Sequence, residues 1–263
     1  MKMKIGFIGC GNMAKAIIEG ILSAALFKKT DIYASALNEN KLTEYCKKVG
    51  ITAGNNKEIS QQCDIIILAV KPQKFADVLP EISDVIQGKL VISIAAGKTI
   101  DYIASFIGDQ KIIRIMPNLN ASVKQSVSAL CANALCKEED VAITKQIFES
   151  IGKVYEIGEK NISAFSAAAC CSPAFTFMYI DGLAKGAMAC GLDKETAYGA
   201  AADAVKGSAA MLEHATDSAE ELVKKVCSPG GTTIEGVKVL RNENFENAVK
   251  KAVNASYLRD KEL

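Results

Sequence analysis

The stretch IGFIGCGNMA, residues 5–14, contains the glycine pattern that decides how the chain begins to fold. Gly9, Gly11 and Ala14 have the spacing G-x-G-x-x-A between an apolar run that suits a strand and a helical pattern. The first glycine permits a tight turn, the second lets a pyrophosphate approach the backbone, and Ala14 lets the helix pack closely on the strand. The free N–H groups at a helix N-terminus attract phosphate. We therefore predict a dinucleotide-binding loop formed by Ile8, Gly9, Cys10, Gly11, Asn12 and Met13.

Short β-branched runs alternate with helical patterns over residues 1–160. The runs IIILAV (65–70) and LVISIA (90–95) have no polar alternation, as expected for central strands covered on both faces. This organisation is typical of βαβ units around a parallel sheet. Strands are predicted at Ile5–Gly9, Ile32–Ser35, Ile65–Val70, Leu90–Ile94, Ile112–Ile115, Val127–Cys131 and Val154–Ile157. Helices are predicted at Asn12–Leu26, Glu39–Val49 and Glu138–Ile151.

From Asn161 onward the strand signal ends and alanine-rich helical stretches follow. Gly191 can end one helix in the left-handed conformation, and Asp193 can cap the next helix. The change in composition predicts two domains, an α/β domain over 1–160 and an all-α domain over 161–263.

The end of the second predicted strand indicates which nicotinamide cofactor fits. It reads YASALN (33–38), whereas a site for NAD usually has an acidic side chain there that binds the ribose hydroxyls. Without that carboxylate a 2′-phosphate is not repelled, and Ser35 and Asn38 can hydrogen-bond it, with Lys41 nearby. We therefore predict NADPH as the cofactor, with NADH as the alternative. Two further strand ends should line the same crevice, at Ala69, Val70, Lys71 and Pro72 and at Ala95, Ala96 and Gly97.

Composition limits the other classes of function. Net charge is +1 without a long run of one sign, which argues against a nucleic-acid surface. Nine cysteines without a signal-peptide pattern favour a reducing, cytoplasmic location, and a single histidine without a CxxC pair predicts no metal site. Residues 162–180 are uncharged, but their many small and hydroxyl side chains favour packing within a protein or at a subunit interface over membrane insertion.

Six motifs together resemble one enzyme family, pyrroline-5-carboxylate reductase. They are IGFIGCGNMA (5–14), LAVKPQ (68–73), SIAAG (93–97), RIMPN (114–118), SPAF (172–175) and VCSPGGTTIEG (226–236). The resemblance implies a Rossmann-type domain followed by a helical domain that forms a homodimer, with each active site between a cofactor domain and helices at the dimer interface. It implies reduction of L-1-pyrroline-5-carboxylate to L-proline, the last step of proline biosynthesis, and leaves open whether dimers form larger rings.

The resemblance also assigns residues to the site. It places the 2′-phosphate contacts on Ser35, Asn38 and Asn56, and the substrate contacts on Ser228, Gly230, Gly231, Thr232 and Thr233. It identifies no strong catalytic acid, and the hydroxyl candidates are Ser228 and Thr233.

The substrate segment suits a carboxylate on physical grounds as well. Gly230 and Gly231 can expose consecutive N–H groups, and a helix that starts at Thr232 would add its positive end. Such a turn binds an anion without arginine, of which the chain has only three. The imine is basic enough to be protonated without a strong acid, so positioning is the main catalytic requirement.

Three alternatives stay open at this point. A β-hydroxyacid dehydrogenase-like enzyme would need a helix-borne lysine, but SAFSAAACCSPAFTFMYIDG (163–182) contains none, and Lys185 and Lys206 lie off that spacing. A related imine substrate would use the same scaffold. Departures from the commonest family pattern at Cys170-Cys171 and Lys224-Lys225 raise the third alternative, an inactive NADP-binding scaffold.

Overall fold

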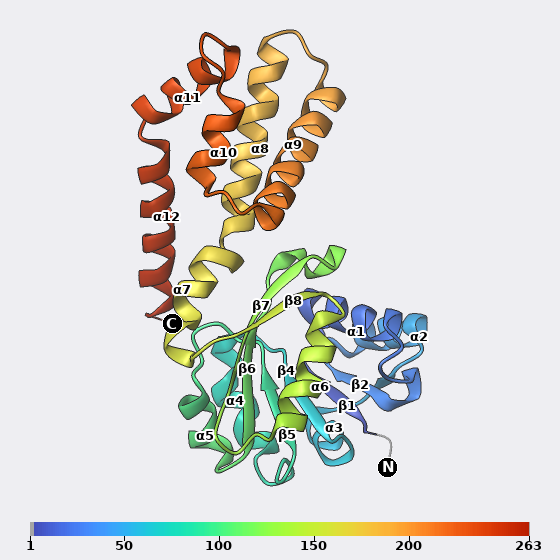
Figure 1. The fold of residues 1–263 in the computed structure, drawn as a ribbon. Coiled ribbons are helices and arrows are strands. Elements are labelled where there is room, and N and C mark those ends of the chain that lie inside the picture. The colour runs from blue at the N-terminus through green and yellow to red at the C-terminus, as the bar shows by residue number, and fades with distance from the viewer. Residues whose placement is uncertain (1–2, 263) are drawn as a thin grey trace. The chain divides into compact units, whose positions relative to one another are not determined.

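Two compact units make up the computed structural model, which describes residues 3–262 (Figure 1). The described part of the first unit is residues 3–170 together with 256–262, and the second unit is Cys171–Ala255. The predicted domain boundary at residue 160 falls inside the first unit, because the turn and short helices that follow it pack with the preceding sheet.

Residues 3–262 contain an eight-stranded sheet of order β3-β2-β1-β4-β5-β6-β7-β8. Adjacent strands are parallel except β6 and β7, which are antiparallel. The connection between those two holds only a short 3₁₀ turn, Leu119–Val123, and a parallel crossover needs a longer segment. The strands are β1 Ile5–Ile8, β2 Ile32–Ser35, β3 Thr52–Ala53, β4 Ile65–Leu68, β5 Leu90–Ser93, β6 Lys111–Met116, β7 Ser126–Ala132 and β8 Gly152–Glu156.

The predicted α/β architecture is confirmed, and each predicted strand forms. Strand β3 was not predicted, because two residues with exposed side chains give no apolar run. Helix α1 ends at Ser23 and not at Leu26, since Ala25 adopts a positive φ of 54° that turns the chain. The helices of the first unit are α1 Asn12–Ser23, α2 Glu39–Val49, α3 Asn56–Gln62, α4 Phe75–Ile82, α5 Ile100–Ile107, α6 Glu138–Glu149 and α7 Ile162–Phe165, followed by a π-helix at Ser166–Cys170.

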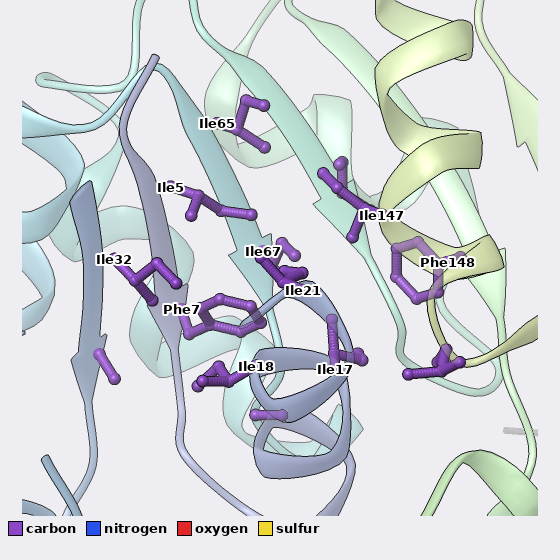
Figure 2. Packing of buried hydrophobic residues seen from close by; sticks show 14 of the residues in the cluster. Ile5, Phe7, Ile17, Ile18, Ile21, Ile32, Ile65, Ile67, Ile147 and Phe148 are labelled. Carbon is purple, nitrogen blue, oxygen red and sulfur yellow. The ribbon is translucent and has the colours of Figure 1, made fainter. Parts of the chain in front are cut away.

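Two apolar cores cover the two faces of the sheet. Successive strand residues point to opposite faces, so Phe7 joins the core under α1, α2 and α6, whereas Ile8 joins the core under α3, α4 and α5. Figure 2 shows the first of these cores, in which Phe7 lies among Ile17, Ile18 and Ile21 of α1. Burial on both faces holds the central strands rigid and fixes the loops that leave their carboxyl ends.

The second unit is built from helices. They are α8 Ser172–Ala189, α9 Lys194–His214, α10 Ala219–Val226, α11 Thr232–Asn242 and the first part of α12 Phe245–Asp260. The predicted punctuation between α8 and α9 is confirmed. Gly191 has φ +102°, Leu192 N–H donates to the Ala187 carbonyl (3.1 Å), and the Asp193 carboxylate accepts from Thr196 N–H (3.0 Å).

The second unit has a small core. Ala184, Ala197 and Ala201 pack where α8 crosses α9, and the Tyr198 hydroxyl donates to Asp181 (2.6 Å) on the same pair of helices. Beyond Ala201, no residue of the described segment 202–262 is buried. Large apolar side chains are exposed on the helices of this unit, at Phe177, Met178, Met211, Leu212, Val226, Val239 and Leu240.

Within residues 3–262, one helical segment is long and apolar enough to cross a membrane by length and composition alone. It is Glu159–Ala189, with a mean hydropathy of 1.3 in its most apolar window. A single such segment is weak evidence for a membrane span, because helices in the cores of soluble proteins meet the same criteria.

Candidate active site

The predicted cofactor residues come together along one edge of the sheet. Strands β2, β1, β4 and β5 are neighbours, and their last residues are paired in register as Ser35, Ile8, Leu68 and Ser93. The four loops that follow therefore leave the sheet side by side. Ligands of open parallel sheets bind in the crevice at such carboxyl ends.

The first loop can be formed only with glycine at position 9. Gly9 has φ +100°, and a side-chain carbon there would lie 2.8 Å from the carbonyl carbon and oxygen of Ala69. Gly11 is the N-cap of α1 with extended backbone, and a carbon added to it would meet no heavy atom within 4 Å. The first turn of α1 has neither a side-chain cap nor an acidic residue. The open space and the uncapped N–H groups fit a pyrophosphate.

Cys10 lies between these glycines. Burial raises the pKa of the Cys10 thiol, and the opposing effect of nearby Lys15 is smaller. The side chain therefore stays uncharged at neutral pH and adds no negative charge beside the predicted phosphate site.

The loop after β2 differs in detail from the sequence expectation. Ser35 is 3% exposed, and its hydroxyl donates to Asn56 Oδ1 (2.6 Å) while it accepts from Gly9 N–H (3.3 Å). The sequence predicted that Ser35 hydrogen-bonds the 2′-phosphate, and the structure shows that its hydroxyl is already hydrogen-bonded to Asn56 beside that loop. Asn38 is exposed and caps α2, because its Oδ1 accepts from Lys41 N–H (3.0 Å), which leaves its amide nitrogen as the donor.

Sequence reasoning missed Leu37 in this loop. Its side chain is 96% exposed although it is large and apolar. An apolar residue within a polar loop was the available signal, and its position after β2 makes Leu37 a candidate surface for a nucleotide base.

The loops after β4 and β5 present small groups to the same edge. Pro72 begins a 3₁₀ turn, Pro72–Lys74, which stiffens the chain after the exposed Lys71. Ala95 is buried and its N–H donates to Ser93 Oγ (3.3 Å), while Gly97 has φ +69°. Short side chains here let a flat ring lie close to the backbone.

The RIMPN motif is buried inside the first unit. Arg114 (4% exposed) pairs with Glu159 at 3.3 Å, and the same Glu159 oxygen accepts from Ile100 N–H (2.8 Å). Asn118 donates from Nδ2 to the Ala169 carbonyl (2.9 Å) within the π-helix. These contacts tie the sheet to the segment that leads out of the first unit, a role that the sequence did not indicate.

The SPGGTT segment forms the turn that the sequence predicted, and α11 begins at Thr232. Gly231 N–H donates to the Ser228 carbonyl (3.0 Å), Gly230 has φ +71°, and Gly231 is an extended N-cap without a side-chain cap. Ser228, Thr232 and Thr233 are exposed. The expected pair of exposed glycine N–H groups is not formed, because the Gly231 N–H closes the turn. The turn offers hydroxyls and the free N–H groups of α11 to solvent, an arrangement that can bind a carboxylate.

Charges near this turn are mostly paired. Lys225 contacts Asp217 (2.6 Å), and Glu235 in the first turn of α11 contacts Lys238 (2.7 Å). Among residues 3–262 no group of three or more histidine, cysteine or acidic side chains could hold a metal ion.

Comparisons with known proteins identify the family of the chain. Residues 159–263 match the family model described as pyrroline-5-carboxylate reductase dimerisation, and residues 4–97 match the model described as NADP oxidoreductase coenzyme F420-dependent. The chain is 40% identical to pyrroline-5-carboxylate reductase of Escherichia coli, over 100% of this chain and 99% of that one.

Solved structures of the same enzyme have the same fold. The enzyme of Streptococcus pyogenes gives a TM-score of 0.92 at 32% identity and covers 100% of this chain and 99% of its own. The enzyme of Plasmodium falciparum, solved with NADP bound, gives a TM-score of 0.91 at 29% identity and covers 99% and 97% of the two chains. Because the identity extends over the whole length of both proteins, the chain belongs to the pyrroline-5-carboxylate reductase family.

Proposed function

We propose that this protein reduces L-1-pyrroline-5-carboxylate to L-proline with NADPH, the last step of proline biosynthesis. The observation that carries the proposal is the exposed, uncapped turn at 228–233, in a chain whose first unit has an open glycine loop at the carboxyl edge of a parallel sheet. The second site suits the carboxylate of a small imino acid, and the first suits a dinucleotide.

The cofactor contacts are proposed along the edge described above. The N–H groups of the glycine loop would hold the pyrophosphate. Asn38 and Asn56 would face the 2′-phosphate, and Ser35 would hold Asn56 in place through its hydrogen bond. The proposed set is Ile8, Gly9, Cys10, Gly11, Asn12, Met13, Ser35, Asn38, Asn56, Ala69, Val70, Lys71, Pro72, Ala95, Ala96 and Gly97. When bound, the nicotinamide supplies a hydride to the imine carbon.

The substrate contacts are proposed on Ser228, Gly230, Gly231, Thr232 and Thr233. The free N–H groups at the start of α11 hold the carboxylate and so orient the ring, and this positioning lowers the entropic part of the barrier. The exposed hydroxyls of Ser228 and Thr233 are the candidates for delivering the imine proton directly or through water.

We propose a homodimer that forms through the helices of the C-terminal domain, 161–263. The exposed apolar side chains of α8, α9 and α11 support this, because a monomer rarely leaves so many uncovered. The N-terminal domain, 1–160, would bind the cofactor. Rings of dimers are a further expectation. A reducing cytoplasm is consistent with nine free thiols.

One assay separates this function from its competitors. Purified protein is mixed with NADPH and pyrroline-5-carboxylate, and cofactor oxidation is followed by absorbance. Turnover that yields proline is the expected result. Faster NADPH oxidation with a different cyclic imine in place of pyrroline-5-carboxylate would identify a related reductase. Reduction of NADP⁺ to NADPH by a β-hydroxyacid, in a parallel assay that starts from NADP⁺, would identify the dehydrogenase alternative. Tight NADPH binding without turnover would identify a scaffold.

A further inference from the structure

A series of hydrogen bonds links the glycine loop to α4 through side chains of the proposed cofactor site. Gly9 N–H donates to Ser35 Oγ (3.3 Å), and the Ser35 hydroxyl donates to Asn56 Oδ1 (2.6 Å). Asn56 Nδ2 then donates to Glu81 Oε2 (2.8 Å). Glu81 lies on α4, far from the glycine motif in sequence, and no local pattern marks it.

The carboxylate at the end of this series fixes the direction of every bond in it. A carboxylate accepts hydrogen bonds and offers none, so Asn56 must turn its NH₂ group toward Glu81. The amide oxygen then faces Ser35, which must donate to it. The lone pairs of Ser35 are left for Gly9 N–H, in agreement with the distances.

Without Glu81 the hydrogen bond between Ser35 and Asn56 can also form in the opposite direction, with Asn56 as the donor. The Phe7 carbonyl lies 3.3 Å from Ser35 Oγ and can take the hydroxyl proton, which would let Ser35 accept from a reversed Asn56. A reversed Asn56 would present its carbonyl oxygen where it now presents N–H donors. An outward oxygen repels a phosphate, whereas a ribose hydroxyl can donate to it.

Neighbouring charges do not replace Glu81. Lys57 pairs with Asp84 (2.8 Å), and Asp77, one turn earlier on α4, pairs with Lys74 (2.9 Å). Glu81 itself is exposed, so solvent screens its charge, while its hydrogen bond to Asn56 depends on contact geometry.

We propose that Glu81 is a positioning residue that keeps the donor face of Asn56 toward the cofactor and thereby favours a 2′-phosphate over a 2′-hydroxyl. The proposal rests on the proposed cofactor site. It assigns Glu81 an effect on cofactor choice that acts through Asn56 and not through its own charge.

The test compares Glu81→Leu with Glu81→Gln and with the matched control Asp77→Leu. Affinity is measured by titration of each protein with adenosine 2′,5′-bisphosphate and with 5′-AMP, and KM with NADPH and NADH. Loss of about one net hydrogen bond should weaken binding of the 2′-phosphate ligand by about fivefold in Glu81→Leu and leave 5′-AMP nearly unchanged. Glu81→Gln can still accept from Asn56 and should behave as the wild type, as should Asp77→Leu.

Two further measurements test the route through Asn56. In Asn56→Ala, the added Glu81→Leu change should cost nothing more, because its target is gone. In nucleotide-free protein, NMR should show a displaced Asn56 side-chain amide signal in Glu81→Leu and not in Asp77→Leu.

Several outcomes would overturn the proposal. Tighter binding of the 2′-phosphate ligand in both Glu81 variants would mean that charge repulsion dominates. An unmoved Asn56 signal, or additive losses of affinity in the double variant, would show that Glu81 does not act through Asn56. If the wild-type protein binds neither nucleotide, the proposed cofactor site fails, whereas wild-type binding without an effect of Glu81→Leu refutes Glu81 alone.

Discussion

Replacing Gly231 by valine should impair use of the imine far more than use of NADPH. A Cβ at position 231 would lie 2.5 Å from Ser228 Oγ and 3.2 Å from the Ser228 carbonyl oxygen. Ser228 is exposed and can rotate, so its hydroxyl gives way while the backbone stays. The backbone of Gly231 is extended, at φ −78° and ψ 171°, which a β-branched residue adopts readily.

The magnitude follows from these contacts. Moving one side chain off its rotamer costs about 1 kcal/mol, so the fold should survive. The carboxylate, in contrast, loses the Ser228 hydroxyl and meets two methyl groups over the free N–H groups of α11. A hydrogen bond to a charged group contributes about 1.5–3 kcal/mol, which corresponds to a rise of roughly 10- to 100-fold in KM for the imine.

The assay is initial-rate kinetics in which the imine and NADPH are varied separately. Gly236→Ala is the matched control, because Gly236 lies in the same helix and an added carbon there meets nothing within 4 Å. That control should leave both KM values unchanged and stabilise the helix by about 0.5–1 kcal/mol. Equal rises in both KM values for Gly231→Val, or an unchanged KM for the imine, would refute the assignment of this turn to the substrate.

Three other predictions concern the first unit. In Gly9→Ala, the alanine must adopt the positive φ of Gly9 and its Cβ meets the Ala69 backbone, so NADPH affinity measured by fluorescence titration should fall by about tenfold or more. An unchanged affinity would contradict the assignment of this loop to the cofactor. Burial raises the pKa of the Cys46 thiol to about 11 and of the Cys63 thiol to about 12, from an ordinary value of 9.0. Above pH 9 these thiols therefore lose their protons in the unfolded chain but keep them in the folded protein. The unfolding free energy measured in urea should fall by about 1 kcal/mol per pH unit for each thiol, and the fall should be less steep in Cys63→Ala. Glu159→Ala leaves the buried Arg114 guanidinium without its carboxylate partner and should lower the unfolding free energy by about 3 kcal/mol. Adding Arg114→Met should recover part of this loss.

Much of the fold was predictable from local patterns. The central strands are recognisable because burial on both faces leaves continuous apolar runs, and the turn at Gly191-Leu192-Asp193 because its residue types suit a left-handed stop and a cap. Strand β3 escaped prediction, since its pairing with β2 comes from the sheet and not from its own two residues. The reversal of β7 was likewise invisible, because alternation of apolar residues does not encode strand direction.

The candidate site likewise contains residues that the sequence marked and residues that it did not. Gly9, Gly11 and the 228–233 turn are marked by sequence because each needs a special backbone or a helix start. Ser35 was predicted to contact the 2′-phosphate, and its hydrogen bond to Asn56 could not be predicted because it depends on a partner outside its own loop. Glu81 gave no signal at all, since its role comes from a contact 25 positions away in the chain.

The second unit has almost no interior of its own, and this has a consequence for the living cell. Because no residue of 202–255 is fully buried and the alanine core is small, the proposed association must supply much of the stability of these helices. Newly made subunits would then be exposed to proteolysis until they meet a partner. Abundance would act as a threshold, below which the enzyme is removed as fast as it is synthesised, and a change that weakens pairing would first appear as a falling protein level before any change in turnover per active site.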